Sequence, residues 1–309
     1  MRTCYLIFCH TDSTSVLRLV RRIRALSTSS DVVVRFEDPD FLEPASVLAA
    51  GALPLVSSTQ ARWGAWSLVE AMIEALRFGL ERTDAERFVI VSGQCYPIRD
   101  LSTWERELEA QQVDAILDSI PDHPKDHHYR WSIVPFPPLP AMVRRLVWHM
   151  GWRMGQLTDP RLQVFPRFAG GLSERRWWIG TPRRNYSGSA PGGIRIKKAA
   201  TWMMLSRRAA ERALARMDHD DRLIDFFRTV RIPDESTLQS LVADDTGLNV
   251  HEGVISAKRF PAGVSSPVWL DVTELEQHLG SGAPFVRKIP PNCDERIIQF
   301  ADSGAEESR

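Results

Sequence analysis

The feature that most constrains the fold of this chain is a short apolar run that ends in a tight polar loop. Phe88–Val91 is unbroken, rich in β-branched residues and too short for a helix, which is typical of a strand covered on both faces. Ser92-Gly93-Gln94 interrupts the run with small and polar residues, and Pro97 stops the strand from continuing. Because α/β proteins bind ligands where parallel strands end, we expect this loop to line a binding site.

The segments around this strand alternate between strand and helix patterns. Further strands are predicted at residues 4–9, 32–36, 115–117 and 202–205. Amphipathic helices are predicted at 13–26, 65–82, 102–109, 207–217 and 273–279, from apolar side chains at helical spacing and from capping boxes at Ser102 and Thr273. A strand, a crossover helix and a second strand form a βαβ unit. The sequence therefore predicts an α/β fold with a mostly parallel central sheet flanked by helices, of the nucleotide-binding type.

Composition limits the class of protein. The 39 basic and 39 acidic residues cancel, so no global field favours nucleic acid or an anionic membrane. Four cysteines are too few for a disulfide scaffold and favour a reducing compartment. The chain shows neither a signal-peptide pattern nor the ~20 apolar residues of a membrane span. We therefore expect a soluble, cytoplasmic protein that binds neither nucleic acid nor a membrane.

One domain is predicted over residues 1–302, with a half of the nucleotide-binding type at 1–120 and a second half at 121–302. A disordered tail is predicted at 303–309. Between 121 and 200 the alternation stops, and 14 Lys and Arg face 4 Asp and Glu among many aromatics. Aromatics such as Trp177 and Trp178 pack in a core, accompany basic residues on nucleic acid, or stack on sugars. The Gly- and Ser-rich stretch at 181–193 predicts a mobile loop over bound substrate.

Two carboxylates follow Pro233. Asp234 and Glu235 are typical of the first turn of a helix, where acidic side chains complement the helix dipole. The alternative interpretation is catalytic, because a carboxylate also serves as a general base.

Two other carboxylate pairs have the D-x-D spacing of a metal site. They are Asp38 with Asp40 and Asp218 with Asp220. Three-residue patterns of this kind arise easily by chance. The strand end at 92–94 carries no carboxylate, so no metal ligand is predicted there.

Two basic pairs, Lys258-Arg259 and Arg287-Lys288, lie in the C-terminal part of the chain. Such pairs are usually solvated, yet they are also available to bind an anionic ligand. His10 follows the first predicted strand, where the base and ribose of a nucleotide lie in such a sheet.

The stretch "VSGQCYPI" at 91–98 resembles the SGQ-D-Y/F-P-I signature of the core-2/I-branching β-1,6-N-acetylglucosaminyltransferases and the peptide O-xylosyltransferases. Similar pieces follow in the family's order: "CYLIFCHTD" at 4–12, "RWGAWSLVEAMIEAL" at 62–76, "ATWMMLSRRAAERAL" at 200–214, "IPDESTLQSLV" at 232–242 and "FVRKIPP" at 285–291. They span most of the chain. In one departure, the family's Asp after Gln is Cys95 here.

This resemblance implies a GT-A-like domain in which 1–120 is the nucleotide-binding half and 121–302 is the acceptor-binding and catalytic half, with a catalytic carboxylate. Glu235 matches the family's base, and Asp234 is expected to shape its turn. Asp234, Trp202, Trp177 and Trp178 are the candidates for contact with the acceptor or the sugar.

The resemblance also implies a donor site. Lys288 matches the family's lysine on the donor phosphates and Arg287 precedes it, whereas Lys258 and Arg259 match a second basic position equally well. Trp63 and Gly64 belong to a segment similar to the family's R/H-W-G. The candidate nucleotide-binding residues are His10, Trp63, Gly64, Ser92, Gly93 and Gln94.

The predicted function is that of an inverting, metal-independent glycosyltransferase. It would move a GlcNAc- or xylose-like sugar from a UDP-sugar donor to a hydroxyl of a glycan or small-molecule glycoside, with no cofactor besides the donor. Two alternatives stay open: a metal-dependent transferase that uses Asp218 and Asp220, and a non-catalytic nucleotide- or sugar-binding protein, which Cys95 would fit.

Overall fold

The computed structural model describes residues 2–9, 12–120, 129, 131–135, 142, 163–168, 175–183, 188–261 and 266–307. The strands in chain order are β1 (Thr3–Phe8), β2 (Asp31–Phe36), β3 (Leu53–Val56), β4 (Arg87–Ser92), β5 (Tyr96–Pro97), β6 (Ala115–Leu117), β7 (Trp131–Pro135), β8 (Gln163–Phe168), β9 (Arg175–Pro182), β10 (Met204–Ser206), β11 (Val250–Glu252), β12 (Ser256–Ala257) and β13 (Phe285–Val286). The α-helices are α1 (Ser13–Leu26), α2 (Pro44–Ala49), α3 (Trp66–Arg82), α4 (Leu101–Ala110), α6 (Arg207–His219), α7 (Asp221–Arg228), α8 (Thr237–Ala243), α9 (Val272–Glu276) and α10 (Glu295–Glu307). Two short 3₁₀ turns are η2 (Pro191–Gly193) and η3 (Pro233–Glu235).

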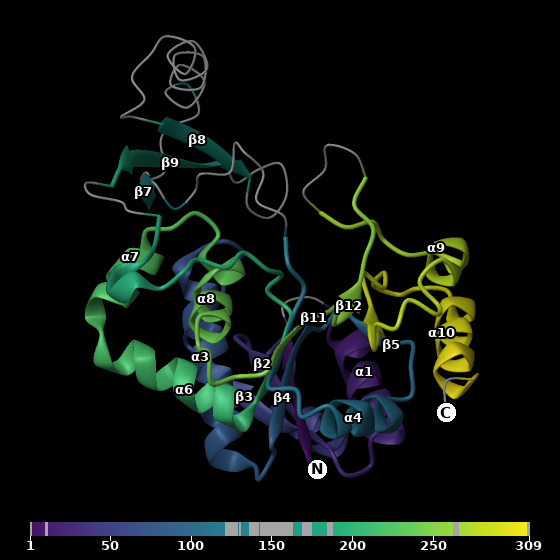
Figure 1. The fold of residues 1–309 in the computed structure, drawn as a ribbon. Helices are drawn as coiled ribbons and strands as arrows, with labels where there is room; N and C mark the ends of the chain where they lie inside the picture. The colour runs from purple at the N-terminus through teal and green to yellow at the C-terminus, as the bar shows by residue number, and fades with distance from the viewer. Residues whose placement is uncertain are drawn as a thin grey trace.

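A central sheet of seven strands runs in the order β11-β6-β10-β4-β1-β2-β3 (Figure 1). β10 is antiparallel to its neighbours β4 and β6, and the other neighbouring pairs are parallel. Every residue of β4 is buried, as expected for a strand covered on both faces. The predicted α/β architecture with a mostly parallel sheet is therefore confirmed.

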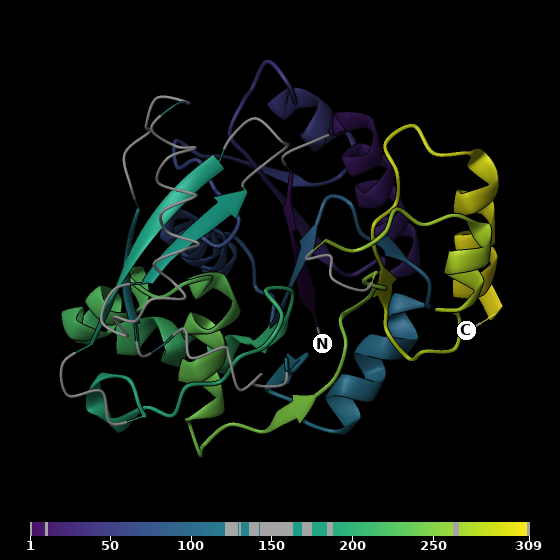
Figure 2. The same cartoon turned by 90° about the horizontal axis from the view of Figure 1, so that it is seen from above.

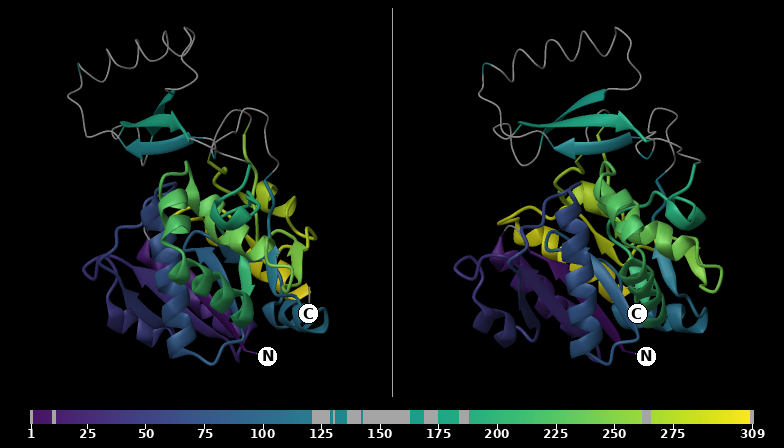
Figure 3. Two further views of the ribbon diagram at one scale, coloured as in Figure 1. Left: turned by 60° about the vertical axis from the view of Figure 1, so that its left-hand side comes forward. Right: turned by 90° about the vertical axis from the view of Figure 1, so that its left-hand side faces the viewer.

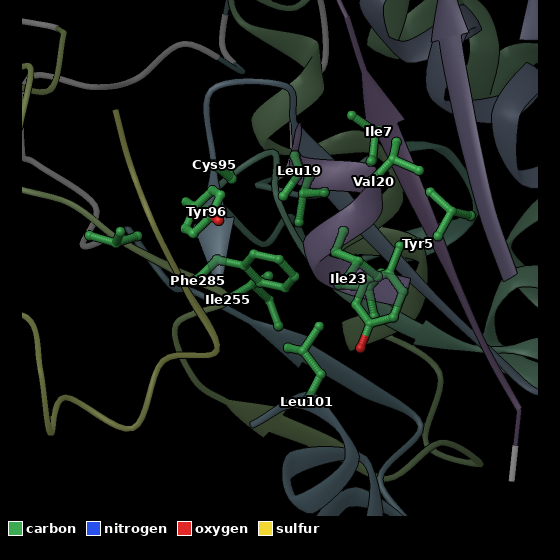
Figure 4. Close-up of a cluster of buried hydrophobic side chains, with 14 of the residues drawn as sticks. Tyr5, Ile7, Leu19, Val20, Ile23, Cys95, Tyr96, Leu101, Ile255 and Phe285 are labelled. Atoms are coloured by element: carbon green, nitrogen blue, oxygen red, sulfur yellow. The ribbon is translucent and has the colours of Figure 1, made fainter. Parts of the chain in front are cut away.

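Helices cover both faces of this sheet (Figures 1 and 2). Tyr5 and Ile7 of β1 belong to a buried cluster with α1, α2, α4, α9 and α10, part of which Figure 4 shows. Leu6 and Phe8 point to the opposite face and pack with α3, α6, α7 and α8. The alternation of side chains along a strand thus divides the core into two layers. It also places Cys4 and Cys9 in different layers, and neither forms a disulfide with a described residue.

Two smaller sheets complete the described part of the chain. One, in the order β12-β13-β5, continues from the end of β4, and the other, β7-β9-β8, lies beside α7 (Figures 1 and 3). The amide of Ile133 in β7 donates at 2.7 Å to the carbonyl of Thr229, the residue that follows α7. Since β9 runs to Pro182, the prediction of a loop over 181–193 is wrong at its start. In the described ranges no helix is long and apolar enough to cross a bilayer.

Three local predictions are wrong in instructive ways. The sequence predicts a buried stripe on α3 that consists of Trp66, Val69, Ile73, Leu76 and Leu80. The buried face instead combines Val69 and Leu76 with Leu68 and Met72, so it is rotated from the predicted stripe. The N-caps of α4 and α9 are Asp100 and Asp271 rather than the predicted Ser102 and Thr273. The carboxylates of Asp100 and Asp271 accept hydrogen bonds from the backbone amides of Thr103 and Glu274.

The C-terminal tail predicted to be disordered is instead helical through Glu307 in α10. Ile297, Ala301 and Ala305 recur every four residues and are buried in the same cluster as Leu275 of α9. Small apolar residues at helical spacing were sufficient for a packed helix, although the segment looks polar overall.

A buried carboxyl group, Glu105 of α4, anchors that helix under β1. The Tyr5 hydroxyl donates to Glu105 Oε1 at 2.6 Å, and the Ser27 hydroxyl donates to the same carboxylate at 2.9 Å. Burial raises the pKa of Glu105, and the hydrogen bonds from Tyr5 and Ser27 oppose that rise. The folded state therefore holds the Glu105 proton more tightly than the unfolded chain does.

We expect this group to destabilise the fold progressively as pH rises. A raised folded-state pKa means that the folded state binds more protons, so the free energy of unfolding falls between the unfolded pKa, about 4.3, and the folded pKa. Glu105→Gln should remove that part of the pH dependence, measured by denaturant unfolding between pH 4 and 8. Glu70→Gln, on the exposed side of α3, is the control that should keep it. Parallel pH curves for the wild type and Glu105→Gln would contradict the assignment.

Candidate active site

The loop after β4 is drawn tightly against the end of β1. The amide of Gly93 donates to the carbonyl of Phe8 at 2.9 Å, and that of Cys95 donates to the carbonyl of Ser92 at 2.9 Å. A Cβ at position 93 would lie 2.7 Å from a methyl of Val16, so only glycine fits this close approach. The strand, the break and the position at the carboxyl edge of the sheet are as predicted. A nucleotide-binding role for residues 92–94 stays a prediction.

The same loop is tied to the segment that follows β13. The amide of Ile289 donates to the carbonyl of Gln94 at 3.0 Å, and the amide of Arg287 donates to the carbonyl of Ala257 at 2.9 Å. Because β12 and β13 are parallel, Lys258 and Arg287 leave their strands at the same edge. Arg287 and Lys288 therefore lie beside the loop after β4, and Lys258 and Arg259 follow the neighbouring strand β12.

Two of these four cations are neutralised by carboxylates. Lys258 forms an ion pair with Asp118, which follows β6. Arg259 forms an ion pair with Glu274 of α9, with Nε 2.7 Å from Oε2. The charges of Lys258 and Arg259 are therefore largely balanced by carboxylates of the protein.

The other two cations have no carboxylate partner in the described part of the chain. Arg287 places its guanidinium 5.1 Å from the ring centroid of Trp202, and its Nε is buried without a hydrogen bond. The ammonium of Lys288 donates to the Ser266 hydroxyl at 2.7 Å and lies 5.4 Å from the ring centroid of Trp269. Burial, followed by the charge of Arg287, lowers the pKa of Lys288. An anion between these side chains would offset both the cost of burying the Lys288 ammonium and its repulsion from Arg287.

The two carboxylates of the P-D-E motif lie in η3, a separate turn before α8, rather than in the first turn of that helix. Ile232 precedes the turn with φ 57°, a left-handed conformation that β-branched residues rarely adopt. Asp234 is 1% exposed and accepts from the Thr201 hydroxyl at 2.9 Å. This burial favours the turn-shaping role of Asp234 over direct contact with an acceptor. Glu235 is partly exposed.

The buried amide of Gln239 holds η3 in place. Its Nε2 donates to the carbonyls of Asp234, at 2.8 Å, and Ala200, at 3.1 Å. The turn is thereby fixed to the segment that leads into β10.

That segment, Ala199–Trp202, connects the candidate base to the candidate cations. The amide of Ala199 donates to the carbonyl of Glu235 at 2.9 Å, Thr201 holds Asp234, and Trp202 lies against Arg287. Four consecutive residues thus contact both ends of the predicted site. The ring of Trp202 also lies 6.2 Å from that of Phe8, centroid to centroid, so it already packs against two protein side chains. Contact of Trp202 with a sugar stays a prediction.

The remaining predicted residues are placed as follows. Trp63 is 47% exposed in a turn before α3, in which Gly64 has φ 62°, as expected for a glycine turn. His10 lies outside the described residues. Trp177 and Trp178 lie on β9, and their side chains are likewise outside the described part.

Two residues at this edge were missed in the sequence. Asp118 directly follows a predicted strand, which was the available signal for it. Trp269 is 49% exposed and lies beside Lys288. No residue near Trp269 in the sequence predicts this contact.

Both carboxylates of the D-x-D candidate in the second half of the chain are paired with arginines. Asp218 is ion-paired with Arg77 of α3, whereas Asp220 caps α7 and pairs with Arg222. Among the described residues, no three His, Cys, Asp or Glu side chains are clustered in a way that could hold a metal ion.

Comparison with known proteins identifies the family. The family model described as Core-2/I-Branching enzyme matches residues 4–254. No curated protein matches the chain.

The solved structures that the chain matches include 4-diphosphocytidyl-2C-methyl-D-erythritol synthase from Anaerococcus prevotii, at 8% identity and TM-score 0.38, covering 81% of this chain and 86% of that one. Another is glucosyl-3-phosphoglycerate synthase from Mycobacterium tuberculosis, at 12% identity and TM-score 0.32, covering 81% and 68%. With TM-scores this low, these likenesses carry no argument about the site. The family match spans most of the chain and agrees with its GT-A-like, mostly parallel sheet, so this protein belongs to the core-2/I-branching family of glycosyltransferases.

Proposed function

We propose that this glycosyltransferase moves a GlcNAc- or xylose-like sugar from a UDP-sugar to a hydroxyl of a glycan or small-molecule glycoside, with inversion and without a metal. The observation that carries the proposal is the segment Ala199–Trp202, which contacts the turn of Glu235 at one end and Arg287 at the other. A base and two cations without carboxylate partners in the described residues are thereby held at one edge of the sheet.

Each group has a distinct chemical role in this proposal. Glu235 takes the proton from the acceptor hydroxyl as its oxygen attacks the anomeric carbon from the face opposite the leaving group. Arg287 and Lys288 stabilise the negative charge that develops on the departing diphosphate. Attack from the opposite face inverts the anomeric configuration, which NMR of the product reports.

The nucleotide can be tested without knowing the acceptor. A ligand at 100 times its dissociation constant stabilises a protein by about 2.7 kcal/mol, which a thermal unfolding assay detects readily. We expect UDP and UDP-sugars to raise the Tm more than ADP, GDP or CDP and their sugars do. Equal or larger shifts with another nucleotide would overturn the UDP assignment, and no shift with any nucleotide would overturn the donor site itself.

We further expect activity to survive chelation. The loop at 92–95 carries no carboxylate, and Asp218 and Asp220 are committed to arginines, so Arg287 and Lys288 are the charges left for the diphosphate. Initial rates in EDTA and in added manganese should agree within about twofold. Loss of activity in EDTA that manganese restores would support the metal-dependent alternative.

A further inference from the structure

Arg287 is a cation whose charge is not balanced by the protein residues that the structure describes. Its guanidinium lies against Trp202, its Nε is buried without a hydrogen bond, and no carboxylate forms an ion pair with it. Burial lowers the pKa of Arg287. A buried, unpaired charge is unfavourable, so such a group normally has a counter-ion or is neutralised.

The side chain beside Arg287 where a counter-ion would be expected is Cys95. It is 2% exposed, and its Sγ lies 3.4 Å from the Ser256 hydroxyl. In the antiparallel pairing of β5 with β13, Tyr96 lies opposite Val286, so position 95 lies next to Arg287. A carboxylate there would neutralise Arg287, whereas a thiol and a hydroxyl leave its charge in place.

The neighbouring cations show that this is not a general property of the edge. Lys258 is paired with Asp118 and Arg259 with Glu274, although both follow β12 only one strand away from Arg287. Among the described residues, carboxylates thus pair with Lys258 and Arg259 but not with Arg287 or its neighbour Lys288.

We propose that Cys95 controls the affinity for the donor. Because its thiol provides no counter-ion for Arg287, the charge of Arg287 remains available to bind the donor diphosphate. The charge at position 95 then sets the affinity for the donor. This inference rests on the proposed function, since it assumes that the anion at this edge is the donor diphosphate.

The test compares Cys95→Asp with Cys95→Asn, which have nearly the same size and differ in charge. Binding is measured by titration calorimetry with UDP and with inorganic pyrophosphate, a probe that lacks the nucleoside. For each ligand, the Kd should be at least 10-fold higher for Cys95→Asp than for Cys95→Asn. Cys95→Asn should stay within about twofold of the wild type. In a ligand-free thermal unfolding assay, Cys95→Asp should have the higher Tm, because its carboxylate balances the buried cation.

Both differences should disappear in the Arg287→Gln background, since the double-mutant cycle isolates the coupling between positions 95 and 287. Ser256→Asp against Ser256→Asn introduces the same charge from β12 and serves if a substitution at position 95 prevents folding. Equal Kd values for the Asp and Asn variants, or a difference that persists without Arg287, would overturn the inference.

The outcomes also separate this inference from the proposed function. If the wild type binds UDP and Lys288→Ala weakens that binding while Cys95→Asp does not, only the role of Cys95 is wrong. If the wild type binds neither UDP nor pyrophosphate, the donor site fails and this inference fails with it.

Discussion

Glu235→Gln is expected to lower turnover by roughly 10²- to 10⁴-fold while leaving the fold and UDP binding nearly unchanged, because a positioned general base contributes about that much to proton transfer. Glutamine keeps the size of the side chain and most of its hydrogen bonding but cannot accept the acceptor's proton. The described contacts that hold this residue use its backbone: its carbonyl accepts from Ala199 at 2.9 Å and its amide donates to Ile232 at 3.2 Å. These contacts survive the substitution.

Asp234→Asn is the matched control in the same turn. Asp234 is buried and bonded to Thr201, so its substitution should lower the Tm more than it lowers the rate. Measuring kcat, the Kd of UDP and the Tm for both variants separates chemistry from folding. Near-normal turnover in Glu235→Gln, or retention of the donor's anomeric configuration in the product, would contradict the proposed mechanism.

The elements of the site were predictable wherever the signal is local. The apolar run of β4 and the small residues after it identify a strand and a close turn, and Gly93 is needed there because its backbone touches β1. The order of strands and helices follows from periodicity, which reports burial on a face. The βαβ rule accounts for the parallel pairing of β1 with β2, but the insertion of the antiparallel strand β10 between β4 and β6 was not predicted.

The partners of charged residues were not predictable, because they depend on tertiary contacts. Nothing near Arg259 in the sequence indicates that it pairs with Glu274, and nothing near Arg287 indicates that Trp202 covers it. The same limit applies to η3, where the sequence pattern is equally compatible with Asp234 or Glu235 as the exposed carboxylate. Packing of Thr201 against Asp234 decides which of the two is buried.

Lys288→Ala is expected to raise the Kd of UDP by about 10- to 100-fold, the loss of a charge-assisted hydrogen bond worth about 1.5 to 3 kcal/mol. The physical reason is that both described partners of its ammonium, the Ser266 hydroxyl and the Trp269 ring, are neutral, so its charge remains available to phosphate. Lys288→Arg should restore affinity only in part, since guanidinium and ammonium differ in geometry. Titration calorimetry with UDP measures all three proteins.

Arg259→Ala is the control that distinguishes a phosphate-binding cation from a surface ion pair. Arg259 belongs to the same set of predicted cations, but its guanidinium is held by Glu274 at a half-exposed position, where such a pair contributes about 0 to 1 kcal/mol to stability. Its removal should leave the Kd of UDP within about twofold. The reverse result, with Arg259→Ala weakening UDP and Lys288→Ala not, would place the diphosphate beside α9 at the end of β12. Arg287 would then lack the diphosphate that the proposed function places beside it.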